Sequence, residues 1–156
     1  MKLSILVLSL TFNLSLASST QGQTNPTEAG VKTTHEALVA AIKTGNLTMA
    51  QGLIDPQALG FFRESVRLVQ LNGTYGPAQV LPDVLADLGR FVINPYETVY
   101  RVRGSTAIVA MSTQLAGKES EKTKTQSLRS TYVYIFINGN WKLLSWHTSV
   151  PPLPVK

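Results

Sequence analysis

Residues 126–149 read QSLRSTYVYIFINGNWKLLSWHTS, and this stretch decides the fold class. Two runs rich in β-branched and aromatic residues, Gln126–Ile137 and Trp141–Ser149, flank the tight-turn signal Asn138-Gly139-Asn140. Such a turn between two alternating runs is typical of a β-hairpin. The C-terminal end of the chain is therefore predicted to be a pair of antiparallel strands.

Both faces of this hairpin carry large apolar side chains. Alternation places Val133, Ile135 and Ile137 on one face of the first strand and Tyr132, Tyr134 and Phe136 on the other. On the second strand it groups Trp141, Leu143, Ser145, His147 and Ser149 against Lys142, Leu144, Trp146 and Thr148. An antiparallel sheet that is covered on one side only shows a polar second face. We therefore expect a second subunit to cover one face, which predicts a homodimer.

The same period of two extends towards the N-terminus. It predicts strands over Glu97–Arg103 and Thr106–Leu115, which are joined at the turn signal Gly104-Ser105. The stretch Ala116–Lys124 mixes both charge signs and is predicted to be a solvent-exposed hairpin tip. These segments continue the antiparallel meander.

Upstream of the strands, the apolar period changes to that of a helix. The first predicted helix carries His35, Leu38, Val39 and Ile42 on one face and ends at Gly45, and Asn46 caps a short second helix. Asp55-Pro56 is predicted to open a third helix over Leu59, Phe62, Val66 and Val69, and Leu81, Val84, Leu85 and Leu88 predict a fourth. Helices followed by an antiparallel meander indicate an α+β fold.

The first 17 residues resemble a secretory signal peptide. Lys2 precedes an uncharged apolar stretch that ends in Ser15-Leu16-Ala17, the order of regions that a signal peptidase recognises; a membrane anchor is the alternative. We assign 1–17 as signal peptide, 18–30 as flexible linker, 31–151 as one domain and 152–156 as tail. Export without any cysteine favours the bacterial periplasm or exterior, with no membrane contact after cleavage.

Three stretches resemble the nuclear transport factor 2-like superfamily, and most closely its SnoaL-like branch of exported bacterial domains. They are HEALVAAIKTGNLTMAQGLID from His35, the strand pair containing Val102–Val109 in the form V-x-G-x-T-A-x-V, and Gly139–Ser149 in the form G-x-W-K-x-x-x-x-H-x-S. The association domain of calcium/calmodulin-dependent kinase is related to this branch. The resemblance implies a cone-shaped fold, with a curved sheet wrapped around helices to leave a pocket, and dimerisation through the outer sheet face. It does not fix a function.

Four residues are candidate ligand contacts. His147 matches the family's terminal-strand histidine and is the best candidate for an acid, a base or a ligand donor; a structural histidine in the sheet or at the dimer seam is the alternative. Arg129 offers a forked donor to an anion, or is a surface arginine. Tyr132 and Tyr134 share a face and line the cavity or pack the dimer. His35 is interpreted as a core or pocket-wall residue.

Several classes of site find no support in the sequence. Many relatives carry an acidic residue in a Thr-Asp-Val context, and Thr131-Tyr132-Val133 lacks it. Two histidines without a clustered ligand pattern predict no metal site, and we expect no cofactor. Neither a G-x-S-x-G elbow nor a phosphate loop occurs. Although the formal net charge is +5, the basic residues are scattered, which does not favour nucleic-acid binding.

Three functional hypotheses remain. The first is an exported, dimeric domain that binds a small, largely apolar molecule. The second is an isomerase, cyclase or dehydratase that uses His147 as acid or base. The third is a protein-association module. Binding ranks above catalysis because no second carboxylate is evident.

Overall fold

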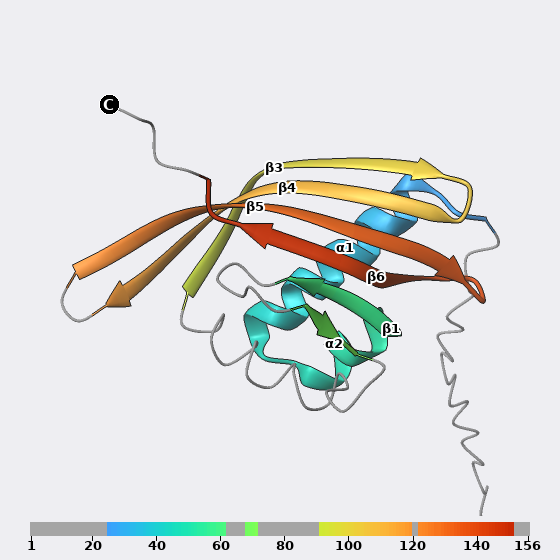
Figure 1. The fold of residues 1–156 in the computed structure, drawn as a ribbon, viewed down its shortest axis with the longest axis horizontal. Helices are drawn as coiled ribbons and strands as arrows, with labels where there is room; N and C mark the ends of the chain where they lie inside the picture. The colour runs from blue at the N-terminus through green and yellow to red at the C-terminus, as the bar shows by residue number, and fades with distance from the viewer. Residues whose placement is uncertain (1–24, 62–67, 72–90, 120–121, 152–156) are drawn as a thin grey trace, which may run out of the picture.

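The computed structural model describes residues 25–61, 68–71, 91–119 and 122–151. Two helices and six strands follow in the order α1 Glu28–Thr44, α2 Leu47–Leu53, β1 Ile54–Phe61, β2 Val69–Gln70, β3 Phe91–Arg103, β4 Thr106–Glu119, β5 Lys122–Ile137 and β6 Asn140–Ser149. The long strands form a strongly twisted sheet, and α1 runs along one side of it (Figure 1). The predicted α+β class is confirmed.

The two helices begin and end where local side chains satisfy their backbone groups. Thr27 accepts a hydrogen bond from the Gly30 amide at 3.0 Å, so α1 begins within the stretch predicted as linker. Gly45 ends α1 in the left-handed region at φ 65°, which glycine adopts without steric cost. Asn46 Oδ1 accepts from the Met49 amide at 3.0 Å, which confirms the predicted cap of α2. In the described segments, neither helix has the length and apolar character that crossing a bilayer requires.

The sheet has the strand order β2-β1-β6-β5-β4-β3. Strands β3 to β6 form the predicted antiparallel meander. Its turns use positive φ angles at Gly104 (55°), Asn138 (51°) and Gly139 (77°), as two-residue hairpin turns require. The strand β1 then adds to β6 in parallel, and β2 pairs with β1.

The third helix expected from Asp55-Pro56 is wrong where the structure describes it, because Ile54–Phe61 and Val69–Gln70 are strands. The Asp55 carboxylate accepts from the Gln57 amide at 2.8 Å, which is a local bend rather than a helix cap. Pro56 lies where the register of β1 against β6 is interrupted, so its missing N–H costs no ladder bond. The helix expected at 81–88 lies outside the described residues.

The hairpin between β4 and β5 is longer than predicted. Ala116–Lys124 was expected to be a tip, but β4 extends to Glu119 and β5 begins at Lys122. Pairing continues through Gly117 with Lys124 and Glu119 with Lys122. The charged residues that suggested a loop therefore belong largely to paired strands.

Two β-bulges change which side chains share a face. Val133 pairs with Ser145 while Tyr134 pairs with Leu143, so Leu144 is an extra residue on β6. Tyr96 is likewise extra on β3. Because side chains alternate along a strand, an extra residue reverses the faces beyond it. The predicted grouping of Trp141 and Leu143 with His147 is therefore wrong.

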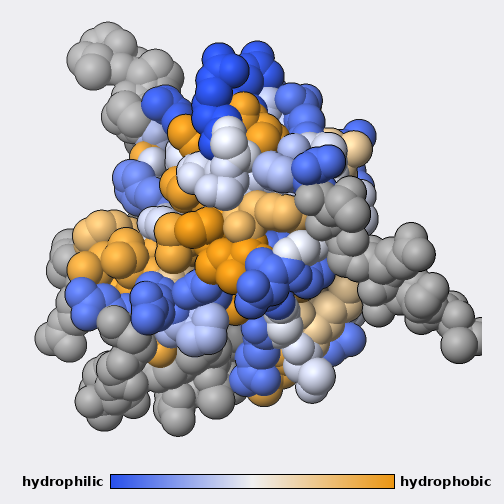
Figure 2. Space-filling model, turned by 90° about the vertical axis from the view of Figure 1, so that its right-hand side faces the viewer, coloured by the Kyte–Doolittle hydropathy of each residue, from blue (hydrophilic) through white to orange (hydrophobic). Residues whose placement is uncertain are grey.

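The sheet has an inner face, which packs against α1 and α2, and an outer face. The core on the inner side includes Val31 and Leu38 of α1 with Val109, Tyr134 and Trp141 of the sheet. Viewed from the end that carries the two turns, apolar side chains also form a band across the middle of the molecular surface (Figure 2). Apolar side chains are therefore exposed on the molecular surface as well as buried in the core.

Candidate functional site

A pocket of about 180 Å³ lies between α1 and the β3–β4 hairpin. Its lining comes from three elements: His35, Glu36 and Val39 of α1, Pro95, Thr98 and Tyr100 of β3, and Met111 of β4. The bulge at Tyr96 brings both Pro95 and Thr98 to the inner face, opposite Thr113 and Met111 respectively. The pocket wall is mostly apolar, with one histidine, one tyrosine hydroxyl and one threonine hydroxyl as its uncharged polar groups.

His35 is the buried polar residue of this site. Its side chain is only 2% exposed, and its Nδ1 lies 2.8 Å from the hydroxyl of Tyr134 on β5. The other ring nitrogen, Nε2, is buried and has no hydrogen-bond partner among the described residues. A buried polar atom of this kind is uncommon in proteins and needs an explanation.

Three tyrosines surround the imidazole. The ring centroid of His35 lies 4.9 Å from that of Tyr132, 5.9 Å from that of Tyr134 and 6.1 Å from that of Tyr100. The Tyr132 hydroxyl bonds to the side chains of Ser130 and Thr148, whose own hydroxyl oxygens are 3.1 Å apart. Tyr132 therefore has its own polar partners, and Tyr134 supplies the hydroxyl that bonds to His35.

Burial keeps this cluster uncharged near neutral pH. It lowers the pKa of His35 from 6.5 to about 4, because a cation loses its hydration in the interior. Burial raises the pKa of Tyr134 well above 10, and Tyr132 and Tyr100 add to that shift. Burial also raises the pKa of Tyr132. The site therefore offers neutral donors and acceptors.

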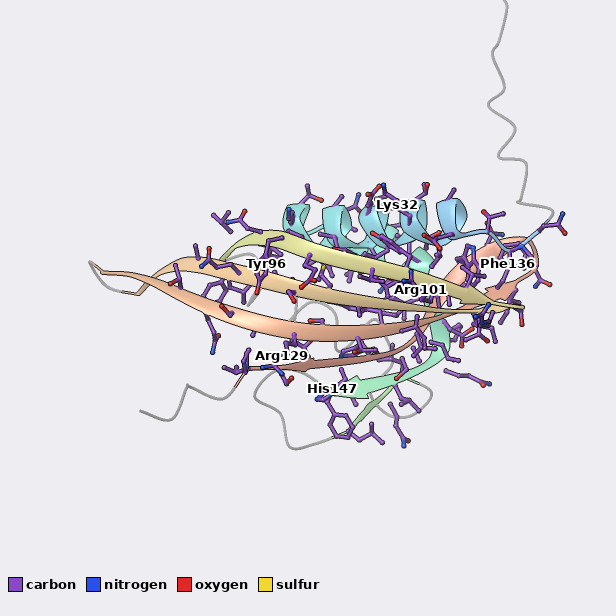
Figure 3. The ribbon with its side chains drawn as sticks, turned by 90° about the horizontal axis from the view of Figure 1, so that it is seen from above. Lys32, Tyr96, Arg101, Arg129, Phe136 and His147 are labelled. Carbon is purple, nitrogen blue, oxygen red and sulfur yellow. The ribbon has the colours of Figure 1, made fainter. Side chains whose placement is uncertain are left out.

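The four predicted contact residues do not come together. Tyr132 and Tyr134 lie on the inner face beside His35, whereas His147 and Arg129 are exposed on the outer face. Figure 3 shows His147 and Arg129 on the side of the molecule away from α1. Alternation along β5 places Arg129 on the face opposite Tyr132 and Tyr134, and the extra residue Leu144 on β6 places His147 on that outer face as well. His147 instead packs beside Phe61 of β1, with ring centroids 6.1 Å apart.

Sequence reasoning assigned His35 to the core or pocket wall but did not single it out as a functional candidate. The available signal was a histidine on the apolar stripe of the first helix. Its partner Tyr134 is 99 positions away, so no local pattern could show the pair. No cluster of three or more potential metal-ligating side chains occurs within residues 25–61, 68–71, 91–119 and 122–151.

This chain has the fold of nuclear transport factor 2-like (NTF2-like) α+β domains. It belongs to the SnoaL-like domain family, whose model matches residues 31–153. No match to a curated protein is found.

Solved structures share the fold at low sequence identity. A candidate ketosteroid isomerase from Shewanella frigidimarina has 20% identity and a TM-score of 0.68, over 77% of this chain and 94% of the other. The CaMKII hub of S. rosetta has 19% identity and a TM-score of 0.68, over 81% and 98%. A candidate dehydratase of the NTF2-like family from Streptomyces avermitilis has 17% identity and a TM-score of 0.65, over 80% and 96%. Such identities establish a shared fold and leave the activity open.

Proposed function

We propose that this SnoaL-like domain binds a small, largely apolar molecule in the pocket between α1 and the β3–β4 hairpin. The observation that carries the proposal is the pocket of about 180 Å³ whose wall includes His35, a buried residue with an unpartnered Nε2. An apolar cavity with a few polar groups is the usual form of a small-molecule site.

Binding is better supported than catalysis by two properties of the histidines. His147, the proposed acid or base, is exposed on the face opposite the pocket. His35 lies in the pocket wall, but its pKa of about 4 is far from the value near the working pH that general base catalysis at neutrality favours.

The binding proposal is tested by filling the pocket. Native mass spectrometry of protein purified from its own host should detect a retained small molecule, and a ligand screen by thermal shift should find binders. Met111→Trp should abolish both the retained molecule and the thermal shift. Val39→Phe, a milder change at a half-buried wall position, should do the same. Met49→Trp is the matched control, because Met49 is 40% exposed on α2 and does not line the pocket. The proposal would be contradicted by ligands that still bind both variants, or by the absence of any binder at millimolar ligand concentration.

A second proposal is self-association through the outer face. On that face Ile108 is 49% exposed and Val99 40%, and Ile108 pairs with the half-buried Val133. An apolar surface over several neighbouring strands is typical of an interaction site. The wild-type protein should have a dimer's mass by light scattering at micromolar concentration. Ile108→Lys should give a monomer, whereas Met49→Lys, at a similarly exposed position on α2, should not; a monomeric wild type excludes this proposal.

Export is proposed from the sequence of residues 1–17 alone. The mature protein should begin after Ala17 and be found in the periplasm or the medium. N-terminal sequencing of the fractionated protein tests this, and an intact Met1 on material in the cytoplasm would contradict it.

A further inference from the structure

The contact between His35 and Tyr134 has two arrangements of its proton. In the first, the Tyr134 hydroxyl donates to Nδ1, and Nε2 then carries the ring's hydrogen. In the second, Nδ1 carries the hydrogen and donates to the Tyr134 oxygen. The heavy atoms, 2.8 Å apart, are compatible with both.

A count of unsatisfied groups favours the first arrangement. Among the described residues, the Tyr134 hydroxyl has His35 as its hydrogen-bond partner. If Nδ1 donated, the Tyr134 O–H would lack an acceptor and Nε2 would lack a donor. If the hydroxyl donates, only the Nε2–H is left without a partner. Leaving fewer buried groups unsatisfied costs less free energy, so the wall residue His35 is an N–H donor.

The charges that the described residues place around the pocket favour an uncharged partner for this donor. Burial lowers the pKa of His35 to about 4, so the ring is neutral at pH 7. No lysine or arginine is among the lining residues in the part of the chain that the structure describes. Glu36 does line the pocket, although it also lies 4.0 Å from Lys32 on the surface of α1. An anion would lose its hydration there without gaining a cationic partner.

We infer that the pocket selects an uncharged molecule of about one ring that carries a neutral hydrogen-bond acceptor, such as a carbonyl oxygen, which accepts a hydrogen bond from His35 Nε2, with Tyr134 holding the imidazole in the donor tautomer. The inference rests on the proposed binding function. The size follows from the volume of about 180 Å³, since a cavity of about 150 Å³ holds benzene. Tyr134 is a positioning residue, since its hydroxyl acts through His35.

The Nε2 atom is enclosed in the structure, so a ligand reaches it only when a wall side chain moves. Met111 is the apolar lining residue with the most freedom, because methionine has an unbranched chain with three rotatable bonds. A rotamer change at Met111 would open a path to Nε2 without movement of the sheet.

Three probes of similar shape separate this inference from the binding proposal. Cyclohexanone has the carbonyl, methylenecyclohexane replaces its oxygen with carbon, and cyclohexanecarboxylate is an anion. Cyclohexanone should bind the wild-type protein about tenfold more tightly than methylenecyclohexane, which is the scale of one neutral hydrogen bond. Equal affinity, or tighter binding of the carboxylate, overturns the inference and leaves the binding proposal standing. If none of the three probes binds, both the inference and the binding proposal are overturned for ligands of this size.

The role of each residue is tested with variants and with a measurement that needs no ligand. His35→Leu should abolish the preference for cyclohexanone, and His35→Gln, which keeps an amide N–H near the position of Nε2, should retain part of it. Nitrogen NMR of histidine-labelled protein should show a protonated Nε2 and an unprotonated Nδ1 for His35. In Tyr134→Phe the two tautomers should mix, and the preference should fall several-fold. A protonated Nδ1 in the wild-type protein overturns the inference whatever the probes do.

Discussion

The Nδ1 atom of His35 on α1 lies 2.8 Å from the hydroxyl oxygen of Tyr134 on β5, and both side chains are buried. This bond joins the first helix to the middle of the sheet across 99 positions of sequence. It ties the stability of the helix–sheet packing to the protonation of one imidazole.

Tyr134→Phe should lower the free energy of unfolding by about 1–3 kcal/mol, because Nδ1 of His35 is left buried without its donor. Urea denaturation followed by tryptophan fluorescence measures the change. Tyr96→Phe removes the same hydroxyl from a side chain that is 66% exposed and should stay within about 0.5 kcal/mol of wild type. Equal effects at the two positions would show that the buried bond contributes nothing.

Stability should fall as the pH falls from about 6.5 to about 4. The pKa of His35 is lowered from 6.5 to about 4 in the folded protein, so in this window the unfolded chain binds the proton more readily. The loss should approach about 3 kcal/mol at pH 4 and should vanish above pH 6.5. His35→Gln, measured by urea denaturation across the same range, should show a shallower pH dependence. If the free energy of unfolding depended on pH in the same way in the wild-type protein and in His35→Gln, the lowered pKa of His35 would be contradicted.

Gly60→Ala should destabilise the protein by about 1–3 kcal/mol, the usual cost of overpacking. A Cβ at Gly60 would overlap the carbonyl oxygen and the indole ring of Trp146, where β1 lies against β6. Gly52→Ala is the matched control, because a Cβ at Gly52 in α2 meets nothing within 4 Å and alanine favours a helix. The midpoint of thermal unfolding should fall in Gly60→Ala and should stay unchanged or rise in Gly52→Ala.

Asn46→Ala should cost about 1 kcal/mol, because the Met49 amide loses its acceptor at the start of α2. Asn46→Asp keeps an acceptor and should remain close to wild type. Chemical denaturation of the two variants distinguishes a capping role from a packing role: in the latter case both substitutions would be equally costly.

The parts of the fold predicted correctly have local causes. Gly45 and Asn46 end and begin helices through their own backbone preference and side chain. The turns at Gly104 and Asn138-Gly139 likewise depend on adjacent residues. The helix predicted after Ile54 was wrong because apolar residues at helical spacing also fit a strand that pairs with β6. That neighbouring strand is remote in sequence.

The site was harder to predict because it depends on register. Tyr132 and Tyr134 were correctly placed on a common face, and both lie beside His35. The bulge at Leu144 leaves no local signal, so strict alternation grouped His147 with Trp141 and Leu143. One extra residue was enough to put a ligand candidate on the opposite surface.

That same residue separates the length of β6 from the choice of side chains that it turns inward. If Leu144 were deleted and pairing with β5 stayed continuous, Leu143 would still lie opposite Tyr134 and Ser145 opposite Val133, so Trp146 would stay inward and His147 outward. Strand order and turns would be untouched. A one-codon deletion at this position would therefore shorten the strand without exchanging the groups that the interior receives.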